Sequence, residues 1–257
     1  MMRTDDDLLI LSDENYRILG ERDFGMPGLR ATESIGPFVQ VQSSGPLIMV
    51  HDALVEPHLG IGHHPHRYNE RLFYILRGQL DHDDALNHIT GHMGPGDLAR
   101  LTEGQTGMYH KEWNNGDEQT RAFILVYAAD PVPPRASFAA LRDAEAPRYE
   151  EGPGVHTKEL IGPKSPLEIH GDIRSYTDSR VDPDAELEVR IADGEAALLA
   201  PLEGSFTAGD AKFEQGQIVL VPTEGRRTVT VKATSPGRLL RIVHGVGDGI
   251  TVGQPLR

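Results

Sequence analysis

The sequence contains no cysteine, so disulfide bonds, zinc ribbons and thiol chemistry are excluded. No apolar run approaches the roughly 20 residues that a membrane-spanning helix needs. Basic residues are also scarce: 25 Lys and Arg stand against 39 Asp and Glu, which gives a formal net charge of -14. A chain of this charge repels nucleic acid and anionic membranes, so we expect neither as a direct partner.

The N-terminal stretch "MMRTDDDLLILSDEN" is acidic and its apolar run is short, which distinguishes it from a secretion signal. We therefore expect a cytoplasmic protein. The composition is that of a globular chain, with 38% hydrophobic and 25% charged residues. A length of 257 residues suffices for two small domains or for one large all-β domain.

Glycine and proline are plentiful, as in folds with many short strands and tight turns. Residues 37–42 alternate between apolar and polar, while 46–50 and 121–128 are more continuously apolar, so all three segments are predicted strands. Residues 130–154 are rich in proline, alanine and charge. We interpret them as a linker, in which Ser137 to Ala144 form a short helix bounded by prolines.

A second β-rich block follows the linker and repeats features of the first. The stretches "LFYILRGQLDHDD" and "AALLAPLEGSFTAGD" share a strand, a glycine, a second strand and an acidic turn. The repeat predicts two copies of one β-barrel or jelly-roll unit. We therefore expect an all-β protein with an N-terminal domain at residues 1–135 and a C-terminal domain at 136–257.

The 12 histidines are concentrated in the first domain. Nine of them lie between His51 and His110, and the second block holds only His156, His170 and His244. The needs of folding do not explain this difference between two copies of one unit. The distribution therefore points to a functional site in the first domain.

Two pairs of residues in this region have the spacing of metal ligands on strands. His64 and His66 are two positions apart, and side chains with that spacing leave the same face of a strand. Pro65 between them lacks an N–H group and favours an extended conformation. His110 and Glu112 repeat the spacing, so two strands facing each other inside a barrel would bring four ligands together.

Three imidazoles and one carboxylate suit a divalent transition metal. We place iron first, while Ni, Mn, Co, Cu and Zn stay open because the ligand list does not choose among them. Four protein ligands around an octahedral ion leave two positions free, as in a catalytic site. The roles of two neighbours stay open: Glu70 as a ligand, a salt-bridge partner or an acceptor for an imidazole N–H, and His82 as a cavity or turn residue.

These residues fall within motifs that resemble the pirin family of bicupins. The stretch "HPHRYNERLFYILRG" at 64–78 is similar to the first cupin motif of that family, and His82 with Asp84 matches the His-x-Asp that follows. The stretches "PGD" at 95–97 and "GMYHKEWN" at 107–114 match the remainder. The resemblance covers most of residues 37–128, and the second half is similar to the family's degenerate C-terminal cupin.

The resemblance implies two cupin domains, a monomer, and a metal in the N-terminal barrel alone, held by His64, His66, His110 and Glu112. The chain departs from the family pattern at three places. Tyr68 stands where the family has Gly or another small-to-medium residue, Lys111 where it often has Ser, and "ARLTEG" at 99–104 where many members have a different segment. These departures concern the choice of substrate more than the fold.

Three functions follow from the resemblance and the inferred site. The first is a dioxygenase of the quercetin 2,3-dioxygenase type, in which a flavonol-like substrate chelates the metal, Glu112 accepts the hydroxyl proton and the substrate reacts with O2. The second is a non-catalytic, metal- or redox-responsive regulator that binds a transcription factor or a metabolic enzyme. The third is a non-redox cupin. Whether the protein is an enzyme is left open by the sequence.

Overall fold

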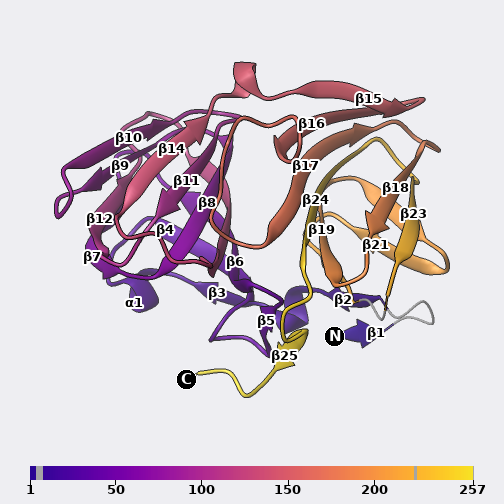
Figure 1. Cartoon of the computed structure of the whole chain (residues 1–257), viewed down its shortest axis with the longest axis horizontal. Helices are drawn as coiled ribbons and strands as arrows, with labels where there is room; N and C mark the ends of the chain where they lie inside the picture. The colour runs from indigo at the N-terminus through magenta and orange to yellow at the C-terminus, as the bar shows by residue number, and fades with distance from the viewer. Residues whose placement is uncertain (4–7, 223–224, 257) are drawn as a thin grey trace.

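The computed structural model of the chain describes residues 1–3, 8–222 and 225–256. Two β-barrels lie side by side in this structure, and the N-terminal half and the C-terminal half of the chain each build one of them (Figure 1). The expectation of an all-β protein with two jelly-roll domains is therefore confirmed. Among the residues described, no helix is long and apolar enough to cross a membrane.

The N-terminal barrel consists of a small and a large antiparallel sheet. The small sheet has the order β10 (Ile89–Met93), β9 (Leu80–Asp84), β12 (Met108–Trp113), β7 (Gly60–His66). The large sheet has the order β14 (Ser137–Leu141), β11 (Leu98–Thr102), β8 (Asn69–Arg77), β13 (Thr120–Ala128), β6 (Leu47–Val55), β4 (Leu29–Ile35), β3 (Arg17–Leu19). A short helix, α1 (Glu21–Phe24), joins β3 to β4.

The C-terminal barrel repeats this plan. Its large sheet has the order β1 (Met2–Arg3), β2 (Leu9–Leu11), β22 (Ile218–Val221), β19 (Glu195–Glu203), β24 (Gly237–Gly245), β17 (Ile173–Val181), β16 (Val155–Ile161), β15 (Arg148–Gly152). Its small sheet has the order β18 (Glu186–Ile191), β23 (Arg227–Ala233), β20 (Ser205–Ala208), β21 (Ala211–Glu214). The interior of this barrel is filled by an apolar cluster that includes Phe206, Phe213 and Val231.

The linker contains a short helix, but it overlaps only the last two residues of the predicted segment 137–144. Ser137–Leu141 forms strand β14, which pairs with β11, and the helix is a single 3₁₀ turn, η2, at Asp143–Glu145. Alanine in this segment favours a helix, yet the buried strand β11 offers an unpaired edge. Pairing with that edge satisfies backbone groups of both segments, so tertiary context overrides helix propensity.

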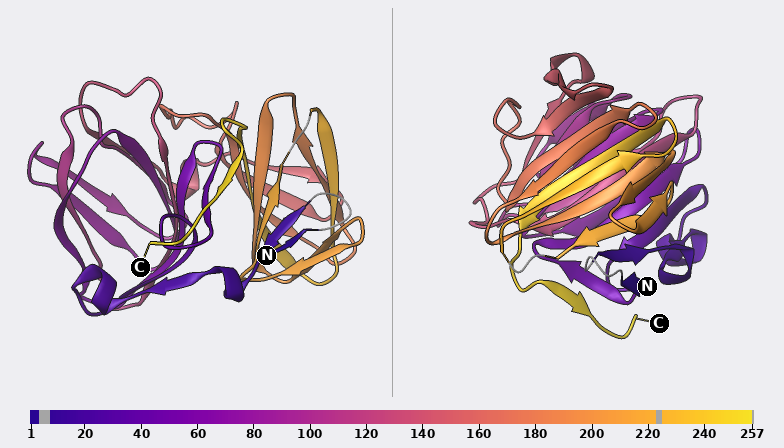
Figure 2. Two further views of the ribbon diagram at one scale, coloured as in Figure 1. Left: turned by 90° about the horizontal axis from the view of Figure 1, so that it is seen from below. Right: turned by 90° about the vertical axis from the view of Figure 1, so that its right-hand side faces the viewer.

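Both ends of the chain cross to the other barrel. Strand β2 pairs with β22 of the C-terminal barrel, whereas β25 (Ile250–Val252) pairs with β5 (Val41–Ser44) of the N-terminal barrel. Figure 2 shows the N-terminal segment running beneath the C-terminal barrel. A division at residues 135 and 136 thus stays a prediction, since these pairings and that of β14 all cross it.

The two large sheets pack against each other and join the barrels. One apolar cluster combines Leu72 and Tyr74 of β8 with Tyr176 of β17 and Leu240 of β24. Each of these side chains is almost fully buried. Since burying such side chains contributes roughly 1.5–3 kcal/mol each, this contact supplies much of the stability that holds the barrels together.

Candidate metal centre

The two strands that carry the predicted ligands are hydrogen-bonded neighbours in the small sheet. They do not face each other across the barrel. In the antiparallel register of β7 and β12, His110 lies opposite His64 and Met108 opposite His66. Residues directly opposite each other in such a pair have close Cβ atoms, and residues two apart share a face. The pairing therefore brings both histidines of β7 and the histidine of β12 to one face.

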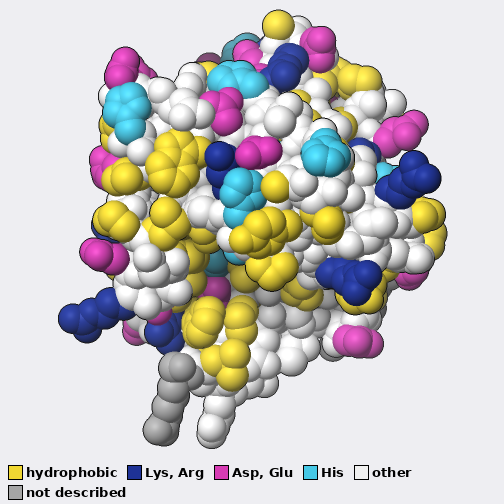
Figure 3. Space-filling view, turned by 90° about the vertical axis from the view of Figure 1, so that its left-hand side faces the viewer, with side chains coloured by type: hydrophobic (Ala, Val, Ile, Leu, Met, Phe, Trp, Pro, Cys, Tyr) yellow, Lys and Arg dark blue, Asp and Glu magenta, His cyan; other side chains and the backbone are white. Residues whose placement is uncertain are grey.

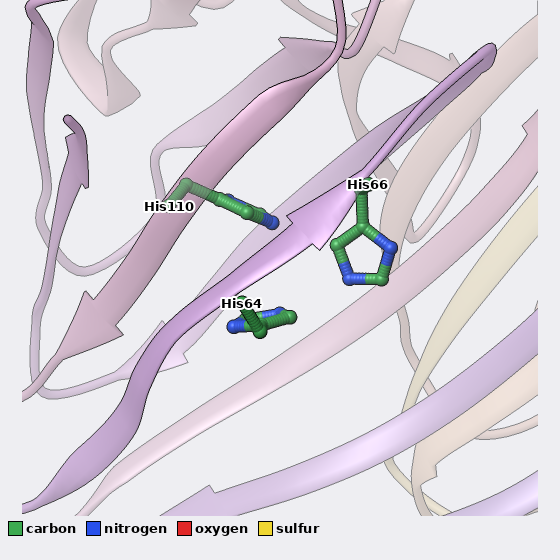
Figure 4. Close-up of side chains that lie close together, drawn as sticks. All are labelled: His64, His66 and His110. Atoms are coloured by element: carbon green, nitrogen blue, oxygen red, sulfur yellow. The ribbon is translucent and has the colours of Figure 1, made fainter. Parts of the chain in front are cut away.

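The three imidazoles form a compact cluster, shown in Figure 4. One nitrogen each of His64, His66 and His110 can be chosen so that all three lie within 4.8 Å of one another. The ring centroids are 4.7 Å apart for His64 and His66, 4.6 Å for His64 and His110, and 5.1 Å for His66 and His110. His110 is buried, and the other two are partly buried. The structure thus brings together three of the four predicted ligands.

Glu112 belongs to an adjoining group with His82 and His110. Donor atoms of these three residues also lie within 4.8 Å of one another. The Glu112 Oε1 atom accepts a hydrogen bond from His82 Nδ1 at 3.1 Å and lies 2.7 Å from His110 Nδ1. The two groups share His110. The assignment of Glu112 as a fourth ligand, and as the catalytic base, stays a prediction.

A β-bulge in β7 lies beside Glu112. Between His64 and Ile61 strand β7 advances three residues while β12 advances two, from His110 to Glu112, so that Glu112 lies opposite Ile61. On its other side Glu112 lies opposite His82 of β9, in a regular pairing that keeps His110 and Glu112 on one face of β12. The bulge therefore adds its extra residue to β7 and bends that strand. Sequence spacing alone could not reveal this bulge, and for the same reason it did not identify His82 as the partner of Glu112.

The hydrogen bonding of the imidazoles fits a bound cation. His64 Nδ1 donates to the carbonyl of Gly62 at 2.8 Å, which leaves the Nε2 lone pair of His64 free. The Nε2 atoms of His110 and His82 are buried without a hydrogen-bond partner among the described residues. Buried polar atoms are normally satisfied, so a concentration of such exceptions at one place is typical of side chains arranged to bind a cation. A transition metal matches these nitrogen donors.

The charge states of these groups also suit metal binding. Burial lowers the pKa of His64, and burial together with the Arg71 guanidinium lowers the pKa of His66 to about 2. Both rings are therefore neutral at pH 7, which is the form that coordinates metals. Burial alone would raise the pKa of Glu112, but the imidazoles of His110 and His82 overcome this effect and lower it. Glu112 is consequently ionised.

The cluster borders a cavity of about 240 Å³ between the two sheets of the N-terminal barrel. Its lining includes His64, His66, Arg71 and Glu112, but most of its walls are apolar side chains such as Phe24, Phe38, Met49, Phe73 and Ile124. Figure 3 shows the side of the molecule that the N-terminal barrel forms, and histidine and hydrophobic side chains lie close together there. The site thus combines a few polar groups with apolar walls, as small-molecule sites do.

Glu70 lies outside the cluster, which resolves its open role. Its side chain is fully buried and accepts hydrogen bonds from Thr102 Oγ1, from Tyr127 Oη at 2.6 Å, and from the backbone N–H and Nδ1 of His170, both at 2.8 Å. His170 lies in the segment between β16 and β17 of the C-terminal barrel. Glu70 therefore links the barrels, and its neighbour Arg71 contacts the histidines instead.

Tyr68, a departure from the family pattern, occupies a position that favours glycine. Its φ angle is 79°, in the left-handed region, and its side chain is 53% exposed between β7 and β8. The guanidinium of Arg67 lies 5.1 Å from the centre of its ring. Lys111 lies 3.5 Å from Asp83 and lines a groove on the outer side of the small sheet rather than the cavity.

Comparison with known proteins agrees with this architecture. A family model described as Pirin matches residues 20–126. The resemblance to the pirin family is confirmed. One relative, Pirin-like protein 2 of Arabidopsis thaliana, is 25% identical over 222 residues, which cover 82% of this chain and 67% of that protein.

Solved structures extend the likeness to both barrels. The chain is similar to a crystal structure of quercetin 2,3-dioxygenase from Acinetobacter baumannii, with a TM-score of 0.77, 16% identity and coverage of 95% of this chain and 91% of that one. It is also similar to the bacterial pirin YhhW of Escherichia coli in complex with nickel(II), with a TM-score of 0.71, 18% identity and coverage of 90% and 99%. At these identities the likeness establishes the pirin-like fold.

Proposed function

We propose that the N-terminal barrel of this pirin-like chain holds a divalent transition metal and uses it to oxidise, with O2, a small substrate that carries adjacent hydroxyl and carbonyl oxygens, as a flavonol does. The observation that carries this proposal is the set of buried imidazole nitrogens that have no hydrogen-bond partner among the described residues, beside a largely apolar cavity. Iron is our first choice of metal. One structural neighbour binds nickel(II) and the other is named a quercetin 2,3-dioxygenase, which supports this class of centre.

His64, His66, His110 and Glu112 would hold the ion. The ion would supply Lewis acidity, which lowers the pKa of a coordinated hydroxyl group. Glu112 is ionised and would take the proton released from the substrate, while His82 Nδ1 keeps its carboxylate oriented at 3.1 Å. The apolar walls exclude water, and Arg71, the one lysine or arginine among the described lining residues, offsets the negative charge of the deprotonated substrate.

The cavity limits the size of the substrate. Its volume of about 240 Å³ lies at or below the lower end of the roughly 300–1,000 Å³ typical of small-molecule sites. A compact ligand of one or two rings suits this space better than a glycosylated flavonoid. Assays should therefore include small hydroxyketones as well as flavonols.

Elemental analysis of the purified protein, followed by aerobic and anaerobic assays with this panel, tests the proposal. We expect about one metal per chain and O2-dependent loss of substrate. His110→Gln should lose metal and activity with the fold retained, whereas His156→Gln, at an exposed position of β16 in the other barrel, should keep both. Metal binding without turnover of any compound in any metal-loaded form would refute the oxygenase and favour the regulatory alternative.

A further inference from the structure

The side chain of Arg71, in strand β8, connects the histidine cluster to a buried carboxylate. Its Nη2 donates to His66 Nδ1 at 2.7 Å, and its Nε donates to Glu103 Oε1 at 2.7 Å. Glu103 is fully buried and also accepts the backbone N–H of Asn69 at 2.9 Å. The guanidinium is therefore fixed at both ends, and its contact with His66 is part of a built network.

This contact determines which nitrogen of His66 carries the proton. A guanidinium has only donors, so His66 Nδ1 must act as the acceptor. In a neutral imidazole the other nitrogen then bears the hydrogen, which places an N–H group on Nε2 of His66. His64 has the opposite arrangement, because its Nδ1 donates to Gly62 and its Nε2 is free. Chemically identical rings in one cluster are thus held in different tautomers.

The arrangement around His66 is the reverse of that in ordinary metal sites. A metal-bound histidine normally donates its second N–H to a carboxylate, carbonyl or water, which orients the ring and raises its basicity. Here a cationic donor occupies that second nitrogen. The guanidinium occupies the lone pair of His66 Nδ1, so the proton cannot move from Nε2 to Nδ1. It also adds a positive charge next to a site for a positive ion.

We propose that Arg71 is a positioning residue that holds His66 as the Nε2–H tautomer and so weakens metal binding. His64, His110 and Glu112 then form the resting ligand set, and His66 coordinates only when its contact with Arg71 is broken. Until then its Nε2–H group faces the cluster as a hydrogen-bond donor. This inference rests on the proposed function in taking the cluster as the metal site, but the tautomer itself does not depend on metal.

The tautomer is tested on metal-free, ¹⁵N-labelled protein by long-range ¹H–¹⁵N correlation of the imidazole rings. We expect His66 in the Nε2–H form and His64 in the Nδ1–H form. Arg71→Lys provides the matched variant: an ammonium keeps the charge beside Glu103 but cannot bridge two acceptors with the planar fork of arginine, so His66 should shift towards the Nδ1–H form. A wild-type His66 found as Nδ1–H would overturn the proposal.

Metal affinity gives the second readout, measured as the Kd for Zn²⁺ by competition with a chelator. Because Arg71→Met alone would strand the buried Glu103 carboxylate, the variant is Arg71→Met combined with Glu103→Gln, and the control is Arg67→Met, an exposed arginine adjacent to His66. We expect the double variant to bind zinc roughly 10- to 100-fold more tightly, the size typical of changes around a metal ligand, and the control to be unchanged.

Equal or weaker zinc binding by a double variant that unfolds like the wild type would show that Arg71 only pairs with Glu103, and would overturn the proposal. Absence of zinc binding in both proteins would instead refute the proposed metal site. The tautomer measurement, made without metal, would still decide the role of Arg71. The two failures are therefore distinguishable.

Discussion

Replacing Glu70 tests whether this residue joins the barrels or belongs to the metal site. Its fully buried carboxylate accepts four hydrogen bonds. Two of them, from Tyr127 Oη and the backbone N–H of His170, end on Oε1, and the other two, from Thr102 Oγ1 and His170 Nδ1, end on Oε2. Glu70→Gln preserves the shape but removes the charge and turns one acceptor into a donor.

The cost of this change follows from the bonds that are altered. A hydrogen bond to a charged group contributes about 1.5–3 kcal/mol and a neutral one about 0.5–1.5 kcal/mol, so the two bonds that a glutamine oxygen retains lose about 1 kcal/mol each. The other carboxylate oxygen becomes an amide nitrogen, which is itself a donor. The two donors that pointed to that oxygen would then face a donor, which costs about 1–3 kcal/mol more unless these groups reorient. We expect a loss of about 3–5 kcal/mol in unfolding free energy, or roughly 6–20 °C in Tm for a chain of this size.

Urea denaturation followed by circular dichroism and by the fluorescence of Trp113 measures this loss, with Glu118→Gln at an exposed position as the control. Metal content is measured on the same samples. Glu70→Gln should be destabilised yet retain its metal, because Glu70 contributes no ligand atom to the cluster of His64, His66 and His110. A variant of wild-type stability that has lost its metal would refute the reasoning and make Glu70 a ligand.

Three further predictions concern the site and its support. Zn²⁺ or Ni²⁺ at about 100 times its Kd should raise the unfolding free energy by about 2.7 kcal/mol, and a similar gain in His110→Gln would contradict the placement of the ion. The metal-free protein should lose stability as the pH falls below the unfolded value of 6.5, because the folded-state pKa of His66 is about 2 and the unfolded chain binds the proton first. The slope is at most about 1.4 kcal/mol per pH unit, and a pH titration of unfolding in which His66→Gln keeps the full slope would assign it to other groups. Gly91→Ala should cost about 1–3 kcal/mol in thermal unfolding, since its new Cβ would collide with the ring of Phe138, which stacks on His82; an unchanged Tm would show that Phe138 moves freely.

The sequence predicted the parts of the site that depend on local geometry. The i, i+2 spacing in "HPH" and in "HKE" places each pair on one face of a strand whatever the rest of the chain does. The uneven histidine distribution correctly pointed to the first barrel as the place of the cluster. Prediction was less complete for residues 137–141, where pairing with β11 outweighs local propensity.

The contacts that distinguish this centre depend on register and on long-range pairing. The bulge in β7, opposite His110 and Glu112, is a property of two strands together, so no pattern in either strand predicts it. Glu70 and Arg71 are adjacent in sequence and point to opposite faces of β8, one to the barrel interface and the other to the histidines. The strand period could have separated their roles, but only the fold shows what each face meets.

The two barrels differ in what fills their interiors. The C-terminal barrel fills its interior with apolar side chains, while the N-terminal barrel gives part of its interior to histidines, a carboxylate and a cavity. An interior whose imidazole nitrogens lack partners in the described part of the chain is less favourable than a packed one, because buried polar atoms without partners cost about 1–3 kcal/mol each. The shared apolar cluster, the exchanged terminal strands and the Glu70 contacts with His170 offset that cost from outside the cavity. The polar cluster is therefore supported by contacts that lie outside it.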